Sequence, residues 1–236
     1  MGRRVVVTGA AGLIGRAVGP VLAGRWELVG VDLRAGDGVA ECDVTDLGAC
    51  RSAFAGADAV VHLAAVPDPG AGWDRLWPAN VVGAYTVARA AIDSGVRRLV
   101  LASSLQAVSA LPPGVQVRGD DQARPANLYG ATKAWAEALG SWDAASSATS
   151  VVALRIGYFA AERPVGGAVA PVERAAWLSA RDAAELIRAA VEAEGVDFLV
   201  ADGISANRHP RADVGRTVRE LGYRPVDDAW AGPDEG

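Results

Sequence analysis

The chain has 236 residues, of which 51% are hydrophobic and 22% are charged, and its formal net charge is −5. This composition is typical of one large globular domain with a substantial core, and it excludes a disordered chain. Nucleic acid is not an expected partner, because the charge is negative and no Lys/Arg cluster is present to displace counterions. No apolar run reaches the ~18 residues of a membrane span, so we expect no membrane partner.

Cysteines and histidines are few. Cys42 and Cys50 are expected to be reduced, and His62 and His209 are too isolated to form a metal site. We therefore predict no metal. Residues 1–4 lead straight into an apolar strand without a signal-peptide pattern, from which we expect a cytoplasmic protein.

The first third of the sequence predicts alternating strands and helices. An apolar strand at 4–8 is followed by a glycine-rich turn, a helix to about residue 23 and a second apolar strand at 27–31. A parallel sheet built in this order binds a dinucleotide at the carboxyl ends of its strands. We expect the next elements to be a strand at 40–44, a helix ending at Phe54, a strand at 59–63 and a long amphipathic helix at about 73–94.

The rest of the chain continues this alternation. We expect strands at 97–102, 151–156 and 196–200, and helices at 128–145, 183–194 and 212–221. A capping box, Ser179-x-x-Asp182, precedes the second of these helices. The pattern predicts an α/β fold, a Rossmann-type doubly wound parallel sheet with a small carboxyl-terminal substrate-binding portion. Residues 1–236 would form a single domain, with substrate-side cap segments at 157–179 and 203–236.

The glycines of the first turn have separate tasks. Gly9 allows a tight turn, Gly12 allows the backbone to approach a pyrophosphate, and Gly15 allows the helix to pack closely on the sheet. Asp32 lies 20 residues after Gly12, the offset at which a carboxylate accepts hydrogen bonds from the adenosine ribose. Such a carboxylate repels a 2′-phosphate, so we expect NAD as the cofactor. NADP is less favoured but stays open, because Arg34 could hold that phosphate.

Tyr129 and Lys133 are spaced i, i+4 on one helical face, and Ser104 lies 25 residues before the tyrosine. With the Gly-x-x-Gly-x-x-Gly turn that follows Thr8, this pattern resembles the extended branch of the short-chain dehydrogenase/reductase superfamily, the NAD-dependent epimerase/dehydratase family. The resemblance implies that Tyr129 is the general acid/base, that Lys133 holds the nicotinamide ribose and that Ser104 orients the reacting oxygen. Bringing the tyrosine pKa from 10 to 7 needs roughly 4 kcal/mol of preferential phenolate stabilisation, which the lysine and the oxidised cofactor would supply.

The expected cofactor contacts come from the glycine turn, from strand ends and from the Tyr-Lys helix. They are Gly9, Gly12, Leu13, Ile14, Gly15, Asp32, Asp43, Val44, Leu63, Ala64, Ala65, Asn80, Tyr129, Lys133 and Ile156.

Within the extended branch, residues 154–157, 177–182 and 222–225 are most similar to uronate dehydrogenases, which oxidise the anomeric carbon of a hexuronic acid with NAD. The substrate side differs from that group. Leu105-Gln106 stands where those enzymes have Asn-His, and Pro67 stands where they have a serine. Since lost hydrogen bonds change discrimination strongly, we expect the cofactor chemistry to be kept and the substrate to be different and less polar.

The expected substrate contacts are Pro67, Ser104, Leu105, Gln106, Tyr158 and Arg174. Arg174 is preferred over Arg163 for holding a carboxylate, because it lies just before Trp177 and an arginine fork suits a carboxylate.

These observations predict an NAD-dependent oxidoreductase that transfers a hydride between nicotinamide and a small sugar-like or alicyclic alcohol or ketone. Two alternatives stay open, an epimerase or dehydratase that retains NAD, and a dinucleotide-binding protein without turnover. The partner is then a small molecule. A homodimer is also expected, because the long helices 73–94 and 128–145 carry apolar side chains that suit an interface or the core. In the second helix these are Trp135, Ala138, Leu139 and Trp142.

Overall fold

A parallel sheet of seven strands is the centre of the computed structural model, which describes residues 3–36, 38–165 and 167–232. The strand order is β10-β7-β5-β4-β1-β2-β3, and every neighbouring pair is parallel. The chain order reverses beside β1, as in a doubly wound fold. The Rossmann-type prediction is therefore confirmed. The strands are β1 Arg4–Thr8, β2 Glu27–Asp32, β3 Val39–Glu41, β4 Ala59–His62, β5 Arg98–Ser104, β7 Ser150–Ile156 and β10 Phe198–Gly203.

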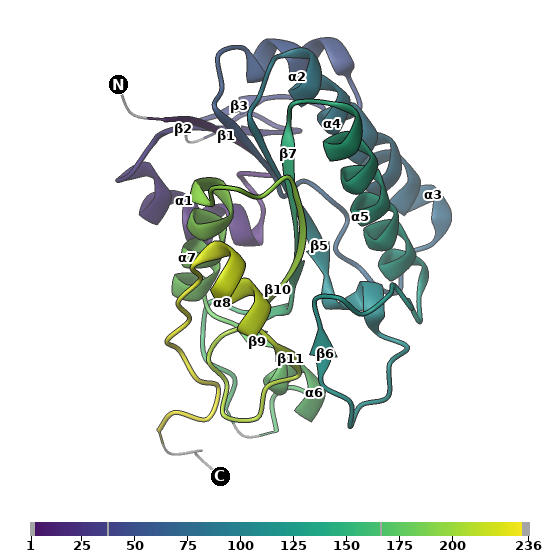
Figure 1. The fold of residues 1–236 in the computed structure, drawn as a ribbon, viewed down its shortest axis with the longest axis vertical. Helices are drawn as coiled ribbons and strands as arrows, with labels where there is room; N and C mark the ends of the chain where they lie inside the picture. Colours follow the sequence, from purple (N-terminus) through teal and green to yellow (C-terminus); the bar gives the residue numbers. More distant parts are fainter. Residues whose placement is uncertain (1–2, 37, 166, 233–236) are drawn as a thin grey trace.

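Helices cover both faces of this sheet (Figure 1). One face carries α1 Leu13–Ala23, α7 Ala180–Glu192 and α8 Gly215–Leu221, and the other carries α2 Leu47–Phe54, α4 Ala84–Asp93 and α5 Leu128–Ser146. The alternation of side chains in β1 explains the two cores. Val5 and Val7 pack in the core beneath α1 and α7, while Val6 packs in the core beneath α2 and α4.

The helix expected at 73–94 is divided into three parts. These are α3 Trp73–Leu76, a π-helical segment η1 Trp77–Gly83, and α4. The wide middle segment carries Asn80, whose Oδ1 accepts from the Val66 amide (2.8 Å) and whose Nδ2 donates to the Val66 carbonyl (3.1 Å). The π-helical segment thus joins the helix to the loop that follows β4, which the helical spacing did not predict.

The segments without helical or strand periodicity in the sequence contain several short helices and strands. They are η2 Leu105–Val108, β6 Val117–Arg118, β8 Tyr158–Phe159, α6 Pro171–Ala175, β9 Trp177–Leu178 and β11 Ala212–Asp213. β6 pairs with β11, and β8 pairs with β9. Several expected ends are corrected as a result. The last helix begins at Gly215 and not at residue 212, because the preceding residues form β11.

Further boundaries differ from the sequence prediction, and the strand expected at 40–44 is β3, Val39–Glu41. β5 continues to Ser104, β10 covers 198–203, and α7 starts at Ala180. The expected capping box before α7 is formed only in part. Ser179 Oγ accepts from the Asp182 amide (3.0 Å), but the Asp182 carboxylate accepts from the amides of residues 226 and 227, both at 3.0 Å. The acid at this position therefore fixes the carboxyl-terminal segment instead of the helix start.

Residues 1–2, 37, 166 and 233–236 lie outside the described residues. The expected cap segments 157–179 and 203–236 are thus described without Gly166 and the last four residues. Within the described part of the chain, no helix combines the length and the apolar character needed to cross a bilayer.

The turn between β1 and α1 leaves no space for side chains at two glycines. Gly9 has φ +71°, and a Cβ there would lie 2.5 Å from the Ala64 amide nitrogen. A Cβ on Gly15 would lie 2.5 Å from the Gly9 carbonyl oxygen, whereas a Cβ on Gly19, one turn further along α1, would meet no atom within 4 Å. The first turn of α1 is therefore in direct contact with the glycine turn.

This difference within one helix predicts opposite effects of the same substitution. We expect Gly15→Ala to lower the free energy of unfolding by about 1–3 kcal/mol, because the methyl group overpacks the turn. Gly19→Ala is expected to raise it by up to about 1 kcal/mol, because alanine has the higher helix propensity. Urea unfolding of the two variants measures both effects, and a Gly15→Ala variant as stable as the wild type would contradict the packing.

One buried carboxylate in β10 has no hydrogen-bond partner. Asp202 is 1% exposed, and neither of its oxygens is hydrogen-bonded within the described residues. Burial raises its pKa from 3.8 to about 7, although the positive charge of Arg155 opposes the shift. The folded chain therefore keeps a proton on Asp202 in a pH range where the unfolded chain has lost it.

Asp202→Asn is expected to remove the resulting pH dependence. The stability contributed by the protonated carboxyl is complete below the unfolded pKa and is lost as the pH rises through the folded pKa. We expect the variant to gain up to about 4 kcal/mol of unfolding free energy near pH 8, and much less near pH 4.5. Urea unfolding at the two pH values tests this, and an equal gain at both would refute it.

Candidate active site

A cavity of about 1220 Å³ lies at the carboxyl ends of the central strands. It is larger than the roughly 300–1,000 Å³ of common small-ligand pockets, so a dinucleotide and a small substrate fit together. Its walls include most of the residues that the sequence singled out. They are Gly9, Gly12, Leu13, Ile14, Gly15, Asp32, Asp43, Val44, Leu63, Ala64, Ala65, Pro67, Ser104, Leu105, Gln106, Tyr129, Lys133, Ile156 and Tyr158.

The glycine turn fits a pyrophosphate. Gly12 is the N-cap of α1, and no side chain caps the helix there. The amides of the first turn, at Leu13 and Ile14, are thus left for an anion, which the positive end of the helix also favours. The lack of side chains at Gly9 and Gly15 keeps the backbone close enough for such contacts.

Two carboxylates are fixed at strand ends on one side of the cavity. Asp32 Oδ2 accepts from the Ala11 amide (2.9 Å) and Oδ1 accepts from the Leu33 amide (2.7 Å). Asp43 Oδ1 accepts from the amide and the hydroxyl of Thr45, both at 2.8 Å. Asp32 is thereby held between the glycine turn and the end of β2, where a ribose hydroxyl could donate to it.

Helix α5 brings Tyr129 and Lys133 to the end of β5. Asn127 caps the helix, since its Oδ1 accepts from the Gly130 amide (2.8 Å). Gln106 holds this cap in turn, because its Oε1 accepts from Asn127 Nδ2 (2.7 Å). The predicted substrate residue Gln106 is therefore also the support of the helix that carries the tyrosine.

The environment shifts the pKa values of both residues. Burial lowers the pKa of Lys133 to about 8, and its Nζ donates to the Ala102 carbonyl at 2.9 Å. Burial raises the pKa of Tyr129, while a hydrogen bond with Ser104 opposes the rise. The lysine Nζ lies 5.5 Å from the centre of the tyrosine ring. Ser104, Tyr129 and Lys133 therefore lie together in one desolvated part of the wall.

Asn80 is not part of the cavity wall. Its side chain is 4% exposed and binds the Val66 backbone, and its Nδ2 also donates to Thr132 Oγ1 (3.2 Å). These hydrogen bonds give Asn80 a structural role, and its expected contact with the cofactor stays a prediction. Asn80 joins the loop after β4 to α5 and so shapes the wall from behind.

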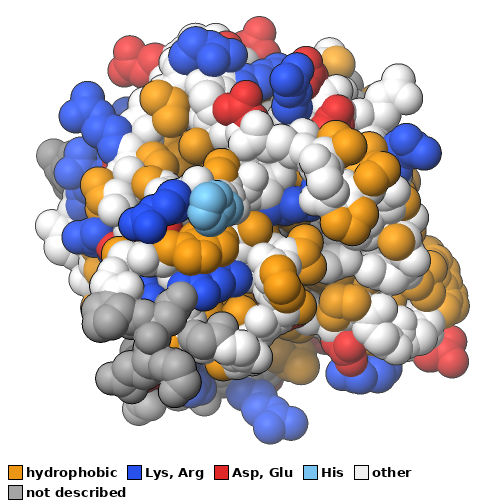
Figure 2. Space-filling model, turned by 90° about the horizontal axis from the view of Figure 1, so that it is seen from below, with side chains coloured by type: hydrophobic (Ala, Val, Ile, Leu, Met, Phe, Trp, Pro, Cys, Tyr) orange, Lys and Arg blue, Asp and Glu red, His pale blue; other side chains and the backbone are white. Residues whose placement is uncertain are grey.

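Arg174 also lies away from the cavity. Its Nε and Nη2 donate to the Ala229 carbonyl (3.2 and 2.9 Å), and its guanidinium lies 4.8 Å from the centre of the Trp230 ring. Arg163 Nη1 donates to the same carbonyl at 3.3 Å. Figure 2 shows the molecule from below the view of Figure 1, the side on which the chain ends, and Lys and Arg side chains lie there among apolar ones. The role of Arg174 in holding a substrate carboxylate therefore stays a prediction, which these contacts with the carboxyl-terminal segment do not favour.

Two charged residues of the cavity were missed in the sequence. Glu173 in α6 lines it, as does Arg211, just before β11. The guanidinium of Arg211 donates to four carbonyls, those of Leu111 (3.1 Å), Pro112 (3.1 Å), Pro113 (3.4 Å) and Val115. No local pattern marks this contact, since its partners lie about 100 residues earlier. Arg211 holds the loop 111–115 over the cavity.

Comparison with known proteins agrees with this geometry. The model of the NAD dependent epimerase/dehydratase family matches residues 5–186. L-arabinose 1-dehydrogenase (NAD(P)(+)) of Haloferax volcanii is 36% identical, with 96% of this chain and 97% of its own length covered. NAD-dependent glucose-6-phosphate dehydrogenase of the same organism is 33% identical, with 97% and 95% covered.

Solved structures lead to the same family. A crystal structure of a uronate dehydrogenase mutant from Agrobacterium tumefaciens, complexed with NAD, has a TM-score of 0.86. It is 30% identical, and the match covers 97% of this chain and 86% of that one. The resemblance found in the sequence is confirmed, and the chain belongs to the NAD dependent epimerase/dehydratase family.

Proposed function

We propose that this chain is an NAD-dependent dehydrogenase that oxidises the anomeric carbon of a neutral aldose to a lactone. The observation that carries the proposal is the convergence of Ser104, Tyr129 and Lys133 at the end of β5, beside a cavity that fits a dinucleotide. The relatives that match nearly the full chain are named as sugar dehydrogenases, which favours an oxidoreductase over an epimerase or a dehydratase.

The first part of the site would hold the cofactor. The amides at the start of α1 bind the pyrophosphate, and Asp32 accepts from the adenosine ribose, which favours NAD over NADP. Lys133 uses one of its three N–H donors on Ala102 and keeps two for the nicotinamide ribose. NAD, when bound, supplies the hydride acceptor.

Tyr129 would act as the general base. The hemiacetal hydroxyl on C1 gives its proton to the phenolate. The hydrogen on C1 leaves with the electron pair of the C1–H bond as hydride, and the bond between C1 and the former hydroxyl oxygen becomes the lactone carbonyl. Burial raises the pKa of the phenol, so the phenolate depends on nearby positive charge, which Lys133 supplies. Ser104 donates to the reacting oxygen and orients it.

The substrate end of the cavity favours an uncharged molecule. Most of its lining is apolar, namely Pro67, Pro69, Leu105, Leu111, Pro112, Pro113, Phe159 and Val172. Glu173 lines the cavity, with its Oε2 accepting from the Ala170 amide (3.0 Å), and Arg211 donates to backbone carbonyls. A hexuronic acid would thus meet a like charge, and Arg174 lies away from the cavity.

Two further proposals concern the whole molecule. Segments 157–179 and 203–236 contribute the substrate-side cap, supported by the positions of α6 and Arg211 at the cavity. A cytoplasmic location is supported by Cys42 and Cys50, which are both free, because exported proteins more often form disulfides.

The activity is tested with matched neutral and anionic sugars. Purified protein is mixed with NAD and with arabinose, xylose, galactose, galacturonate, glucose, glucuronate or glucose 6-phosphate, and nicotinamide absorbance is followed. We expect turnover with neutral aldoses, and we expect Tyr129→Phe to lower kcat at least about a hundredfold because the base is lost. NAD binding should remain, since the phenol hydroxyl is not needed for it.

Other outcomes point to the alternatives. Bound NAD that co-purifies and gives no net reduced product would favour an epimerase or dehydratase. NAD binding with no conversion of any sugar would favour a protein without turnover. A Tyr129→Phe variant with wild-type kcat would show that another group is the base.

We also propose a homodimer through α4 and α5. Five aromatic side chains on this face are between 41% and 56% exposed, namely Trp73, Trp77, Tyr85, Trp135 and Trp142. A cluster of large apolar side chains on a monomer surface is typical of an interface.

A charge placed on this face should disrupt the dimer. We expect the wild type to elute with twice the mass of the chain in light scattering, and Trp142→Glu to elute as a monomer, because a carboxylate would be buried without a partner. Val21→Glu is the control, since Val21 is 61% exposed on α1 across the sheet. A monomeric wild type at micromolar concentration would reject the interface.

A further inference from the structure

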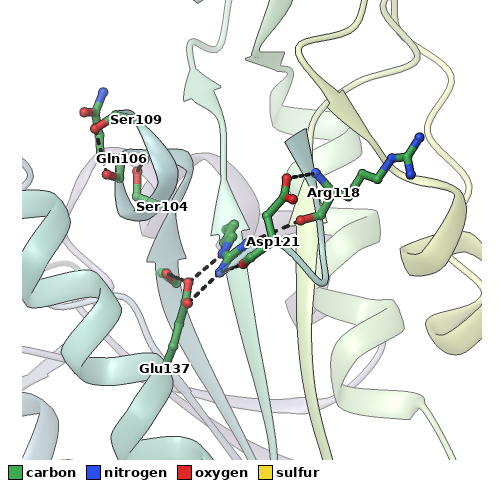
Figure 3. A network of polar contacts seen from close by, with 8 residues as sticks. Ser104, Gln106, Ser109, Arg118, Asp121 and Glu137 are labelled. Carbon is green, nitrogen blue, oxygen red and sulfur yellow. Dashed lines mark hydrogen bonds and ion pairs between the residues drawn. The ribbon is translucent and has the colours of Figure 1, made fainter. Parts of the chain in front are cut away.

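A buried polar network lies next to Ser104 at the end of β5 (Figure 3). Ser103 Oγ donates to Glu137 Oε1 at 2.6 Å, and Arg155 donates to both oxygens of the same carboxylate, from Nε at 2.8 Å and from Nη2 at 2.9 Å. Their exposed fractions are 2%, 6% and 2%. The network joins β5, α5 and β7 at the end of the sheet that carries the cavity.

The network continues a series of contacts between β5 and α5. Ala102 accepts from Lys133 through its carbonyl, Ser103 donates to Glu137, and the Ser104 side chain lies near enough to Tyr129 to lower the pKa of its phenol. Positions 129, 133 and 137 are one helical turn apart on one face of α5. Three consecutive strand residues thus each face one turn of the helix, and the hydrogen bonds at Ala102 and Ser103 fix the helix along the strand.

Arg155 extends the network to the cover of the cavity. Its Nη2 donates to the Asp121 carbonyl (3.0 Å) and its Nη1 donates to the Arg118 carbonyl (3.5 Å). Asp121 Oδ2 in turn accepts from the Arg118 amide (2.8 Å), which closes this turn (Figure 3). The turn belongs to the same connection, 105–126, that supplies the loop held by Arg211.

We infer that Ser103, Glu137 and Arg155 are positioning residues, which set the location of the Tyr129 phenol against the Ser104 hydroxyl by fixing α5 on β5. This inference rests on the proposed dehydrogenase function. Ser103 lines the cavity, but its hydroxyl donates to Glu137, and Glu137 and Arg155 do not line the cavity. The polar groups of the network therefore act through their neighbours. Small displacements of reacting groups lower rates strongly.

Ser103→Ala is the variant of choice, because it removes one link and leaves the buried ion pair of Glu137 and Arg155 intact. Removing either charge would leave the other unpaired in the interior and endanger the fold. Ser103→Thr restores the hydroxyl. Ser150→Ala is the matched control, since Ser150 Oγ donates to the Arg97 carbonyl (2.7 Å) at the opposite end of the same pair of strands.

The readouts are kcat, KM, the NAD dissociation constant, Tm and the pH profile of kcat, measured with the best neutral aldose. We expect Ser103→Ala to lower kcat about tenfold, with KM and NAD affinity changed less than about twofold. The acidic limb of the profile, where kcat rises as the phenol loses its proton, should move to higher pH, because a poorly aligned Ser104 stabilises the phenolate less. Ser103→Thr should regain most of kcat, and Ser150→Ala should leave kcat and the profile unchanged.

Distinct results would overturn the two proposals. A wild type that converts no sugar rejects the dehydrogenase function. The network is then judged by the pKa of Tyr129, titrated by ultraviolet absorbance against Tyr129→Phe, and it fails if Ser103→Ala leaves that pKa unchanged. With an active wild type, the inference fails if Ser103→Ala keeps kcat and the pH profile, or if it and Ser150→Ala lower Tm and kcat alike.

Discussion

The close approach of α5 to β5 is the constraint on which the candidate active site depends. Two glycines permit it. A Cβ on Gly130 would lie 2.2 Å from the Gln106 carbonyl oxygen, in η2 directly after β5, and a Cβ on Gly140 would lie 3.1 Å from Leu101 Cδ1 in β5. With the helix at this distance, Lys133 reaches the backbone of β5. The phenol, the ammonium group and the serine hydroxyl then lie in one desolvated place, where charges interact more strongly than in water.

That desolvation has opposite consequences for the two ionisable groups. It raises the pKa of Tyr129 and lowers that of Lys133 to about 8, so in both cases the neutral form gains. The phenolate form of the tyrosine therefore has to be stabilised by specific neighbours, the Ser104 hydrogen bond and the lysine charge. In the proposed mechanism, the position of α5 along β5 therefore matters for chemistry and not only for stability.

Patterns within the sequence were sufficient to predict the central sheet and most of the residues that line the cavity. Runs of valine gave β1 and β4, and the i, i+4 spacing gave Tyr129 and Lys133, because both depend on local periodicity. The π-helical segment was not predictable, since it accompanies the bond of Asn80 to a loop 14 residues earlier. The direction of Arg174 was not predictable either, since its partner Ala229 lies 55 residues later.

The hydrogen bonds of the arginines show why the substrate end of the cavity differs from the sequence prediction. The guanidinium group has five donors and suits carboxylates, yet Arg211 and Arg174 donate to backbone carbonyls, and Arg155 divides its donors between the Glu137 carboxylate and backbone carbonyls. Each fixes a segment without regular structure near the end of the sheet. The N–H groups that donate to these loops are then not available to bind an anionic ligand. A chain with the fold of a uronate dehydrogenase can therefore hold its cap in place with the same type of side chain that a uronate would need, and this is the physical reason for proposing a neutral substrate.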